Sequence, residues 1–421
     1  MRLLIFGEAF LSPAYLPRVR YFVSYFSRKG WQVDFVNEKS EYSYDVPEKV
    51  SWLTIDYYKN EKGILGRLEW MIKFIMDLSI DFKGRYFYRK SQSFVTEKKY
   101  DLIFCSSSFT FPLTTAARMA RKLDVPLFVD LRDIAEQSPD DNHFIAHRPP
   151  FFFGNILIKI YKRINIKRRN TVLRKAAGVT TVSPWHVKTL SIYNPNTHLI
   201  YNGFDEDLFI PEIRTTSLFT ISYFGRIYNE KIRNPRLLFV ALDELRKKKI
   251  ISPGNTIVKW FVDEQSIVVV KNIAESYHLS EFIEFHNFTA PENLPAELNN
   301  SSLLLVLCNS QNTKNYFGIM TTKFFEALGA NRPVICIPDN NDNLSEVIKN
   351  TQCGLVSSDA TEVERYLQDK FSEWQQTGLT TGLLSEETRL DFSRKKGAET
   401  LEKLFENAIK KRHYESKDIN S

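Results

Sequence analysis

Short apolar runs rich in β-branched and aromatic residues alternate along this chain with longer stretches whose apolar residues recur every three or four positions. In the first half, the runs that predict strands are residues 3–6, 33–36, 102–105, 127–129, 178–182 and 198–201. Patterns typical of helices lie between them, for example at residues 18–29 and 114–123. This alternation predicts a parallel, doubly wound sheet.

A second series of strand patterns follows at residues 219–224, 258–262, 283–285, 303–307, 334–337 and 354–356. The polar, turn-rich stretch 202–216 separates the two series, and we place the interdomain linker there. We therefore predict an α/β chain with two Rossmann-like, doubly wound domains, residues 1–204 and 205–385, which face each other across a cleft. Residues 386–421 are predicted to form a helix that packs back on the first domain, followed by a tail.

The composition narrows the class of partner. At 421 residues the chain is too long for one ordinary core. Its net charge of +7 favours an acidic partner, namely nucleic acid, an anionic membrane surface or a phosphorylated substrate. No base-reading or RNA-stacking motif accompanies the charge, so we predict no nucleic-acid partner. Four scattered cysteines without metal-ligand spacing predict buried thiols in a reducing cytosol rather than structural zinc: Cys105, Cys308, Cys336 and Cys353.

Two segments interrupt the strand–helix order. Residues 61–83 carry an apolar stripe at helical spacing, and residues 159–175 hold eight Lys or Arg residues without an acid. With aromatic residues nearby, at 151–153 and at Tyr161, the basic segment fits the interface of an anionic bilayer. A core-packing helix with a basic solvated face explains it equally well. No apolar run reaches the roughly 18–20 residues of a spanning helix, and the N-terminus reads as a strand, so we expect a protein that is soluble or attached to a membrane face.

The stretch 223–235 reads Tyr-Phe-Gly-Arg-Ile-Tyr-Asn-Glu-Lys-Ile-Arg-Asn-Pro. A strand is predicted to end before Gly225, whose lack of a side chain lets the backbone approach a ligand. Arg226 offers a planar fork for phosphate oxygens, and Lys231 adds a second charge before a helix for which Asn234 is the predicted N-cap and Pro235 the first residue. These features favour a diphosphate site over solvated loop cations.

The stretch 317–338 is the most informative part of the chain. It reads Phe-Gly-Ile-Met-Thr-Thr-Lys-Phe-Phe-Glu-Ala-Leu-Gly-Ala-Asn-Arg-Pro-Val-Ile-Cys-Ile-Pro. A polar loop opens a short helix that carries Lys323 and Glu326 one turn apart, and a buried strand follows. Glu326 alone would suit a surface helix, where a glutamate near the N-terminus matches the helix dipole. Together with the Gly225-Arg226 turn, it is the better candidate for a ligand-binding acid.

These motifs resemble those of the family 4 (group 1) retaining glycosyltransferases, which have the GT-B fold. The resemblance rests on Tyr-Phe-Gly-Arg-Ile-x-x-Glu-Lys, followed by Lys-x-x-Glu-Ala-Leu-Gly-Ala-x-x-Pro-Val-Ile, and covers roughly residues 1–410. Supporting segments are 129–134 (Val-Asp-Leu-Arg-Asp-Ile), 178–183, 199–205 and the base-binding loop at 285–290. The resemblance implies that residues 1–204 form the acceptor side and residues 205–385 bind a nucleotide sugar.

The resemblance also assigns roles to residues. Arg226 and Lys231 would bind the donor diphosphate and offset charge on the departing nucleoside diphosphate, and Glu326 would hold the ribose hydroxyls. The family's Glu-x7-Glu motif has its first glutamate where this chain has Gly318. The remaining predicted donor-binding residues are Gly7, Gly225, Asn287, Gly318, Ile319, Met320, Thr321 and Lys323.

Near the reaction centre the chain offers Ser106–Ser108 in place of a histidine common in the family. Asp133, or less well Asp130, is predicted to make a polar contact to the acceptor or the donor sugar. Arg132 could equally form a structural ion pair with either aspartate. The predicted catalytic residues are thus Arg226, Lys231 and Asp133.

We expect a metal-independent, retaining glycosyltransferase without a cofactor. In this family the leaving diphosphate assists the incoming hydroxyl, so no glycosidase-type carboxylate pair is required. The expected donor is of the UDP or GDP type, and the acceptor is a glycan or a lipid-linked saccharide in bacterial surface polysaccharide biosynthesis. The protein is expected in the cytoplasm or on the inner face of the membrane. A nucleotide-sugar epimerase of the same fold and a catalytically degenerate binding subunit are the alternatives.

Overall fold

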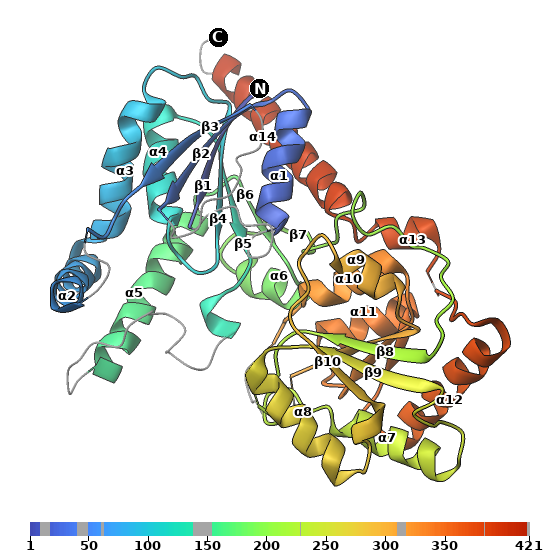
Figure 1. Cartoon of the computed structure of the whole chain (residues 1–421). Coiled ribbons are helices and arrows are strands. Elements are labelled where there is room, and N and C mark those ends of the chain that lie inside the picture. The colour runs from blue at the N-terminus through green and yellow to red at the C-terminus, as the bar shows by residue number, and fades with distance from the viewer. Residues whose placement is uncertain are drawn as a thin grey trace. The chain divides into compact units, whose positions relative to one another are not determined.

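The computed structural model describes residues 1–8, 17–39, 49–59, 63–137, 154–227, 229–309, 317–382 and 384–418. The chain forms two compact units (Figure 1). Unit 1 contains Met1–Tyr201 together with Ala398–Ser421, and unit 2 contains Asn202–Gly397. Unit 1 is therefore built from both ends of the chain.

Unit 1 is built on a parallel sheet in the order β3-β2-β1-β4-β5-β6-β7. Its strands are β1 (Arg2–Gly7), β2 (Gln32–Glu38), β3 (Val50–Ile55), β4 (Leu102–Ser107), β5 (Leu127–Leu131), β6 (Gly178–Thr181) and β7 (Thr197–Leu199). β1 is paired with β2 on one side and with β4 on the other. The order of the strands reverses there, and open sheets of this kind bind ligands at the carboxyl ends of such a pair.

Helices cover both faces of this sheet (Figure 1). The helices of unit 1 are α1 (Pro17–Arg28), α2 (Gly63–Ile80), α3 (Phe82–Val95), α4 (Leu113–Leu123), α5 (Gly154–Leu173), α6 (Pro184–Leu190) and the part of α14 (Arg394–Asp418) that follows Gly397, and α2 packs against α3. Side chains of β1 alternate between two cores, as a strand period of two requires. Leu4 and Phe6 enter the core shared with α3 and α4, whereas Leu3 and Ile5 enter the core shared with α1 and α14.

The C-terminal helix α14 is part of the second of these cores. Phe405 stacks on Phe26 of α1 with ring centroids 5.4 Å apart. It also meets Phe104 of β4 edge-on at 5.4 Å and Phe128 of β5 at 5.1 Å. The predicted return of a C-terminal helix to the first domain is therefore confirmed.

Unit 2 is built on a second parallel sheet, in the order β10-β9-β8-β11-β12-β13. Its strands are β8 (Phe219–Phe224), β9 (Thr256–Phe261), β10 (Ile283–His286), β11 (Leu303–Leu307), β12 (Val334–Ile337) and β13 (Gly354–Val356). The helices are α7 (Arg236–Lys247), α8 (Glu264–Ser276), α9 (Leu294–Asn299), α10 (Thr322–Ala330), α11 (Asn343–Thr351), α12 (Ala360–Thr377) and α13 (Glu386–Leu390). Here the strand order reverses between β8 and β11, whose carboxyl ends carry the predicted diphosphate turn.

The predicted fold class is confirmed, since both sheets are parallel and lie within α/β units. One strand was missed, β3, because its six residues are mostly half-buried or exposed and show no buried run. All four cysteines are buried, as expected. Among the described residues, no helix is long and apolar enough to cross a membrane.

Candidate functional site

The Gly225-Arg226 turn follows β8 directly. Gly225 has φ 144°, a backbone conformation that favours glycine. A Cβ atom at this position would lie 2.7 Å from Cε of Lys323, so the lysine stem lies across the turn. The two stretches that the sequence analysis singled out, about one hundred residues apart, are therefore in contact within unit 2.

One edge of the Arg226 guanidinium contacts an acid, and the rest of the side chain is exposed to solvent. Its Nε lies 3.0 Å from Oδ2 of Asp263, and its side chain remains 56% exposed. Asp263 caps α8 by accepting hydrogen bonds from the Ser266 Oγ at 2.5 Å and the Ser266 N–H at 3.0 Å. These hydrogen bonds, chiefly that of the Ser266 hydroxyl, hold the pKa of Asp263 below its usual value, and Arg226 adds to the effect. Arg226 also lies over the Phe288 ring, 5.6 Å from its centroid.

The rest of this loop carries Lys231 and also Arg233, which was not among the predicted site residues. Lys231 is exposed, and its backbone N–H donates to Oδ1 of Asn229 at 3.0 Å. Arg233 donates from Nη1 to the carbonyl oxygen of Arg226 at 2.9 Å, so it braces the turn. Its position within the quoted motif is the signal that could have identified it.

The predicted start of the following helix was wrong by one residue. α7 begins at Arg236, and Pro235 precedes it in the cap position without a side-chain cap. The carboxamide of Asn234 still accepts the first helical N–H, that of Arg236, at 2.9 Å. Proline has no N–H to donate, which is why this hydrogen bond moves to the next residue.

Lys323 and Glu326 project from α10 into one recess of unit 2. Tyr223, Phe224, Arg233 and Thr321 also line this recess. Burial raises the pKa of Glu326, while the positive charges of Arg394 and Lys323 oppose the shift. Lys323 is exposed, yet desolvation by the surrounding protein atoms lowers its pKa. The negative charge of Glu326 opposes this shift, and the positive charges of Arg233 and Arg226 reinforce it. Two cations, Lys323 and Arg394, therefore act on the Glu326 carboxylate, and Arg226 and Arg233 act on Lys323.

The loop before α10 is fixed by an acid that the sequence analysis did not consider. Gly318, with φ 70°, donates its N–H to Oδ2 of Asp342 at 2.8 Å. Burial raises the pKa of Asp342, and hydrogen bonds from backbone N–H groups, including those of Gly318 and Ile319, oppose the shift. Met320 is buried, and Thr321 precedes α10 without forming a side-chain cap. Sugar contacts by residues 318–321 stay a prediction, and the Gly318 amide already has an acceptor.

The predicted base-binding loop follows β10. Asn287 is exposed. The ring of the preceding His286 stacks on Phe261 with centroids 4.6 Å apart, and Phe261 stacks on Phe224 at 4.4 Å. Rings at the carboxyl ends of three adjacent strands thus form a ladder beside the Gly225-Arg226 turn.

In unit 1, the carboxyl ends of β1, β4 and β5 bring Glu8, Ser108 and Arg132 together. The Glu8 carboxylate accepts from the Ser108 N–H at 2.8 Å and from the Ser108 hydroxyl at 2.5 Å, and it also pairs with Arg132. The alternative of a structural ion pair for Arg132 is therefore confirmed, but in the described residues its partner is Glu8 and not Asp130 or Asp133. Glu8 begins the loop after β1, whose residues 9–16 lie outside the described residues.

Asp130 is part of the unit 1 core. It is fully buried and accepts from Arg18 at 2.9 Å, Ser106 at 3.0 Å and Thr180 at 2.7 Å. A carboxylate with three internal donors and no exposed surface has a structural role, which leaves Asp133 as the candidate.

Asp133 follows β5 and is exposed. Crowding by protein atoms nevertheless raises the pKa of its carboxyl through desolvation, an effect that Arg132 opposes and Glu8 reinforces.

Gly7 is needed for packing. A Cβ atom on this residue would lie 2.6 Å from Cζ of Phe35 on β2. A donor contact by Gly7 stays a prediction. Among the described residues, no group of three or more His, Cys, Asp or Glu side chains could hold a metal ion.

Comparison with known proteins identifies the fold. No family model matches the chain, and no curated protein matches its sequence. Solved structures match over nearly its whole length. The chain superposes on Anabaena Alr3699/HepE in complex with UDP and glucose with a TM-score of 0.61 and 16% identity, covering 97% of this chain and 100% of that one. For a glycosyltransferase from Rickettsia africae the TM-score is 0.64, with 13% identity and 97% and 98% coverage.

A third match is the lipopolysaccharide outer core galactosyltransferase WaaB in its apo form. Its TM-score is 0.57 at 12% identity, with 98% of this chain and 100% of that chain covered. The chain therefore has the GT-B fold of these glycosyltransferases.

Proposed function

We propose that this chain is a metal-independent, retaining glycosyltransferase that transfers a sugar from a UDP- or GDP-type donor to a glycan or lipid-linked saccharide. The observation that supports it most is the contact between the Gly225-Arg226 turn and Lys323 of α10. It joins two elements of the predicted donor pocket in one place.

The cations of unit 2 suit a pyrophosphate. Arg226 keeps one edge of its guanidinium against Asp263, and the exposed remainder offers donors to phosphate oxygens. Lys323 is already partly desolvated beside Arg226 and Arg233, so an added anion would stabilise its charge. Lys231 supplies a further exposed charge from the same loop. In transfer, these groups would offset the charge that develops on the departing nucleoside diphosphate.

Glu326 would bind the ribose hydroxyls of the donor. Its carboxylate lies in the recess beside Lys323, where it can accept hydrogen bonds from a diol. The nucleobase would lie near Asn287 and the exposed ring of Phe288. The Anabaena neighbour was solved with UDP and glucose, which supports a donor of this kind.

Unit 1 would supply the acceptor side. Asp133 is an exposed carboxyl with a raised pKa at the carboxyl end of β5, close to the Glu8–Arg132 pair, and it would contact the acceptor or the donor sugar. WaaB acts on lipopolysaccharide outer core, which favours bacterial surface polysaccharide biosynthesis here too. The enzyme would then work in the cytoplasm or on the inner face of the membrane.

A panel assay tests this proposal. The protein is incubated with UDP- and GDP-sugars and with glycan or lipid-linked acceptors, and release of nucleoside diphosphate is measured with and without a chelator. We expect release with one donor class that the chelator does not reduce, and NMR of the product should show a retained anomeric configuration. Binding without release for every acceptor would identify a binding subunit, and isomerisation of the free nucleotide sugar would identify an epimerase.

A further inference from the structure

Helix α2 of unit 1 presents a row of apolar side chains to solvent. The exposed residues are Ile64 (84%), Leu65 (67%), Leu68 (47%), Ile72 (49%) and Ile75 (50%). Spacings of three and four residues place Ile64, Leu68, Ile72 and Ile75 on one face of the helix. A contiguous apolar face of this kind on a folded protein marks an interaction site.

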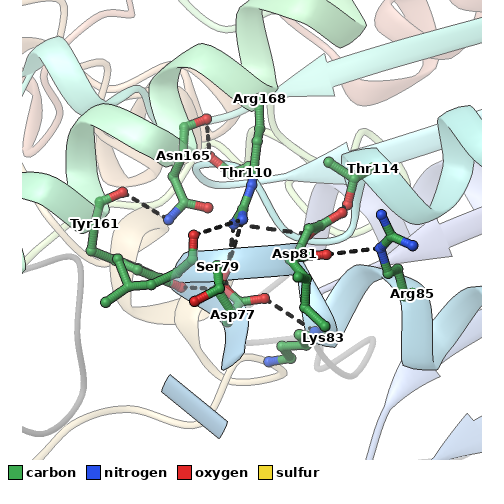
Figure 2. Close-up of polar contacts among 12 residues, drawn as sticks. Asp77, Ser79, Asp81, Lys83, Arg85, Thr110, Thr114, Tyr161, Asn165 and Arg168 are labelled. Carbon is green, nitrogen blue, oxygen red and sulfur yellow. Dashed lines mark hydrogen bonds and ion pairs between the residues drawn. The ribbon is translucent and has the colours of Figure 1, made fainter. Parts of the chain in front are cut away.

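The opposite face anchors α2 firmly. Phe74 packs on the ring of Tyr161 in α5, with centroids 5.1 Å apart. The Tyr161 hydroxyl donates to Asp77 at 3.2 Å, and Arg168 of α5 donates to the carbonyl oxygen of Asp77 at 2.6 Å (Figure 2). The exposed face therefore belongs to a helix with a defined orientation within unit 1.

Helix α5 extends the same kind of surface. Ile156 and Ile160 are exposed near its start, and Arg163 and Lys167 are exposed one and two turns later. Spacings of four, three and four residues put all four side chains on one face. This face changes from apolar to basic along the helix.

A basic groove lies where the end of α2 meets α3, α4 and α5. It has a volume of about 720 Å³, and Leu78, Ser79 and Ile80 of α2 form part of its wall. Ser79 is four residues beyond Ile75, so the groove continues from the apolar face of α2. The cations that line the groove are Arg85 of α3, Arg118 and Arg121 of α4, and Lys167 and Arg168 of α5.

Asp81 is the single acid among these lining residues. It pairs with Arg118 at 2.5 Å and lies 4.0 Å from Arg168. The Nη1 atoms of Arg118 and Arg168 are buried without a hydrogen-bond partner in the described part of the chain. Figure 2 shows Arg168 reaching from α5 to the junction of α2 and α3, with Arg85 beside Asp81. Asp77 also lies 3.7 Å from Arg168 Nη1. Five cations against these two carboxylates leave the groove with a net positive charge, and the two buried nitrogen atoms have no hydrogen-bond acceptor among the described residues.

We propose that α2, the exposed face of α5 and the basic groove form a docking surface for an anionic phospholipid bilayer. The apolar side chains enter the boundary between headgroups and acyl chains, and the groove binds a lipid phosphate. The combination of an apolar face with adjoining cations matches the chemistry of that interface. A second copy of the chain would bring two basic grooves together, which like-charge repulsion opposes. The inference names the membrane contact of the proposed transferase and in that sense rests on the proposed function.

Partition into vesicles tests the surface. The full-length protein is mixed with phosphatidylcholine vesicles with or without phosphatidylglycerol, and a partition coefficient is measured at low and high salt. We expect tight binding only to the anionic vesicles. Each cation near such a surface contributes about fivefold, so Arg121→Gln with Lys167→Gln should weaken binding about 25-fold at low salt. Both side chains are exposed, so the fold should be kept.

Two further variants sharpen the test. Leu68→Ser with Ile72→Ser should weaken binding by about tenfold or more at both salt concentrations, because apolar insertion is not screened. Lys271→Gln with Lys403→Gln removes two exposed cations outside the docking surface and should leave the partition coefficient unchanged.

Four results would overturn the inference. These are equal binding to neutral and anionic vesicles, an equal loss in the control variant, displacement from vesicles by millimolar inorganic phosphate, and a dimer in solution that the Leu68→Ser and Ile72→Ser changes dissociate. Titration of each variant with UDP and GDP separates this inference from the proposed function. Parent protein that binds nucleotide but not anionic vesicles would remove only the docking surface, and parent protein that binds anionic vesicles but neither nucleotide would remove only the transferase; variants that lose vesicle binding while they keep nucleotide binding support the docking surface.

Discussion

Replacing Arg226 by alanine separates binding from stability. The guanidinium touches Asp263 at 3.0 Å but is more than half exposed, so this pair is worth only about 0.2–1 kcal/mol to folding. Asp263 keeps its hydrogen bonds from Ser266 in the variant, and those contribute most to its lowered pKa. Arg226→Ala should therefore leave the urea-denaturation midpoint almost unchanged.

Donor binding should change much more. A charge-assisted hydrogen bond to phosphate is worth about 1.5–3 kcal/mol. The loss of about 2–3 kcal/mol raises a dissociation constant roughly 30- to 150-fold, since about 1.4 kcal/mol is a factor of ten. Titration calorimetry with UDP, GDP and their sugars measures this directly.

Arg236→Ala is the matched control. Arg236 is a similarly exposed arginine near the same loop, and its ion pair is with Glu230 at 2.6 Å. Its removal should leave nucleotide affinity unchanged. The reasoning fails if Arg226→Ala binds nucleotide as well as the parent protein, or if both variants lose the same affinity.

Three other changes test separate parts of the account. Glu326→Gln should weaken nucleotide binding measured by calorimetry. Because burial raises the pKa of Glu326 in the folded protein, the parent loses stability as the pH rises above the ordinary value of 4.5, so the variant should be more stable than the parent at about pH 7. This gain should shrink toward about pH 4, and a difference that does not change with pH would contradict the reasoning. Asp130→Asn breaks the buried pair with Arg18 and should lower the free energy of unfolding by about 3–5 kcal/mol in urea titrations, and a loss below about 1 kcal/mol would refute its structural role. Asp342→Asn weakens the hydrogen bond from the Gly318 N–H and should speed hydrogen exchange of that amide. It should also reduce the affinity for the nucleotide sugar about fivefold and leave the affinity for UDP unchanged. Equal losses for both ligands would show that this loop does not contact the sugar.

Much of the fold could be predicted from local patterns. The bounds predicted for four strands of unit 2 match the structure: β8, β11, β12 and β13. β8, β11 and β12 are largely or wholly buried, and a strand buried on both faces reads as a continuous apolar run. β3 was not predicted because its partly exposed residues show neither a continuous apolar run nor a strict alternation of apolar and polar residues.

The site was only partly predictable. Gly225, Arg226 and Glu326 could be chosen because turn chemistry and helix position are local properties of a sequence. Their partners are not local. The Glu8–Arg132 pair joins residues 124 positions apart, and its formation depends on which strands are adjacent and on the side-chain conformations at their ends. For the same reason the hydrogen bond from Gly318 to Asp342, across 24 positions, could not be predicted.

The central claim is that unit 2 holds a pyrophosphate between the turn after β8 and the start of α10. A crystal structure of the protein soaked with UDP or GDP tests this most directly. The account predicts phosphate oxygens within hydrogen-bond distance of the Arg226 guanidinium and the Lys323 ammonium, with ribose hydroxyls at Glu326. Nucleotide bound elsewhere, or none at saturating concentration, would contradict it.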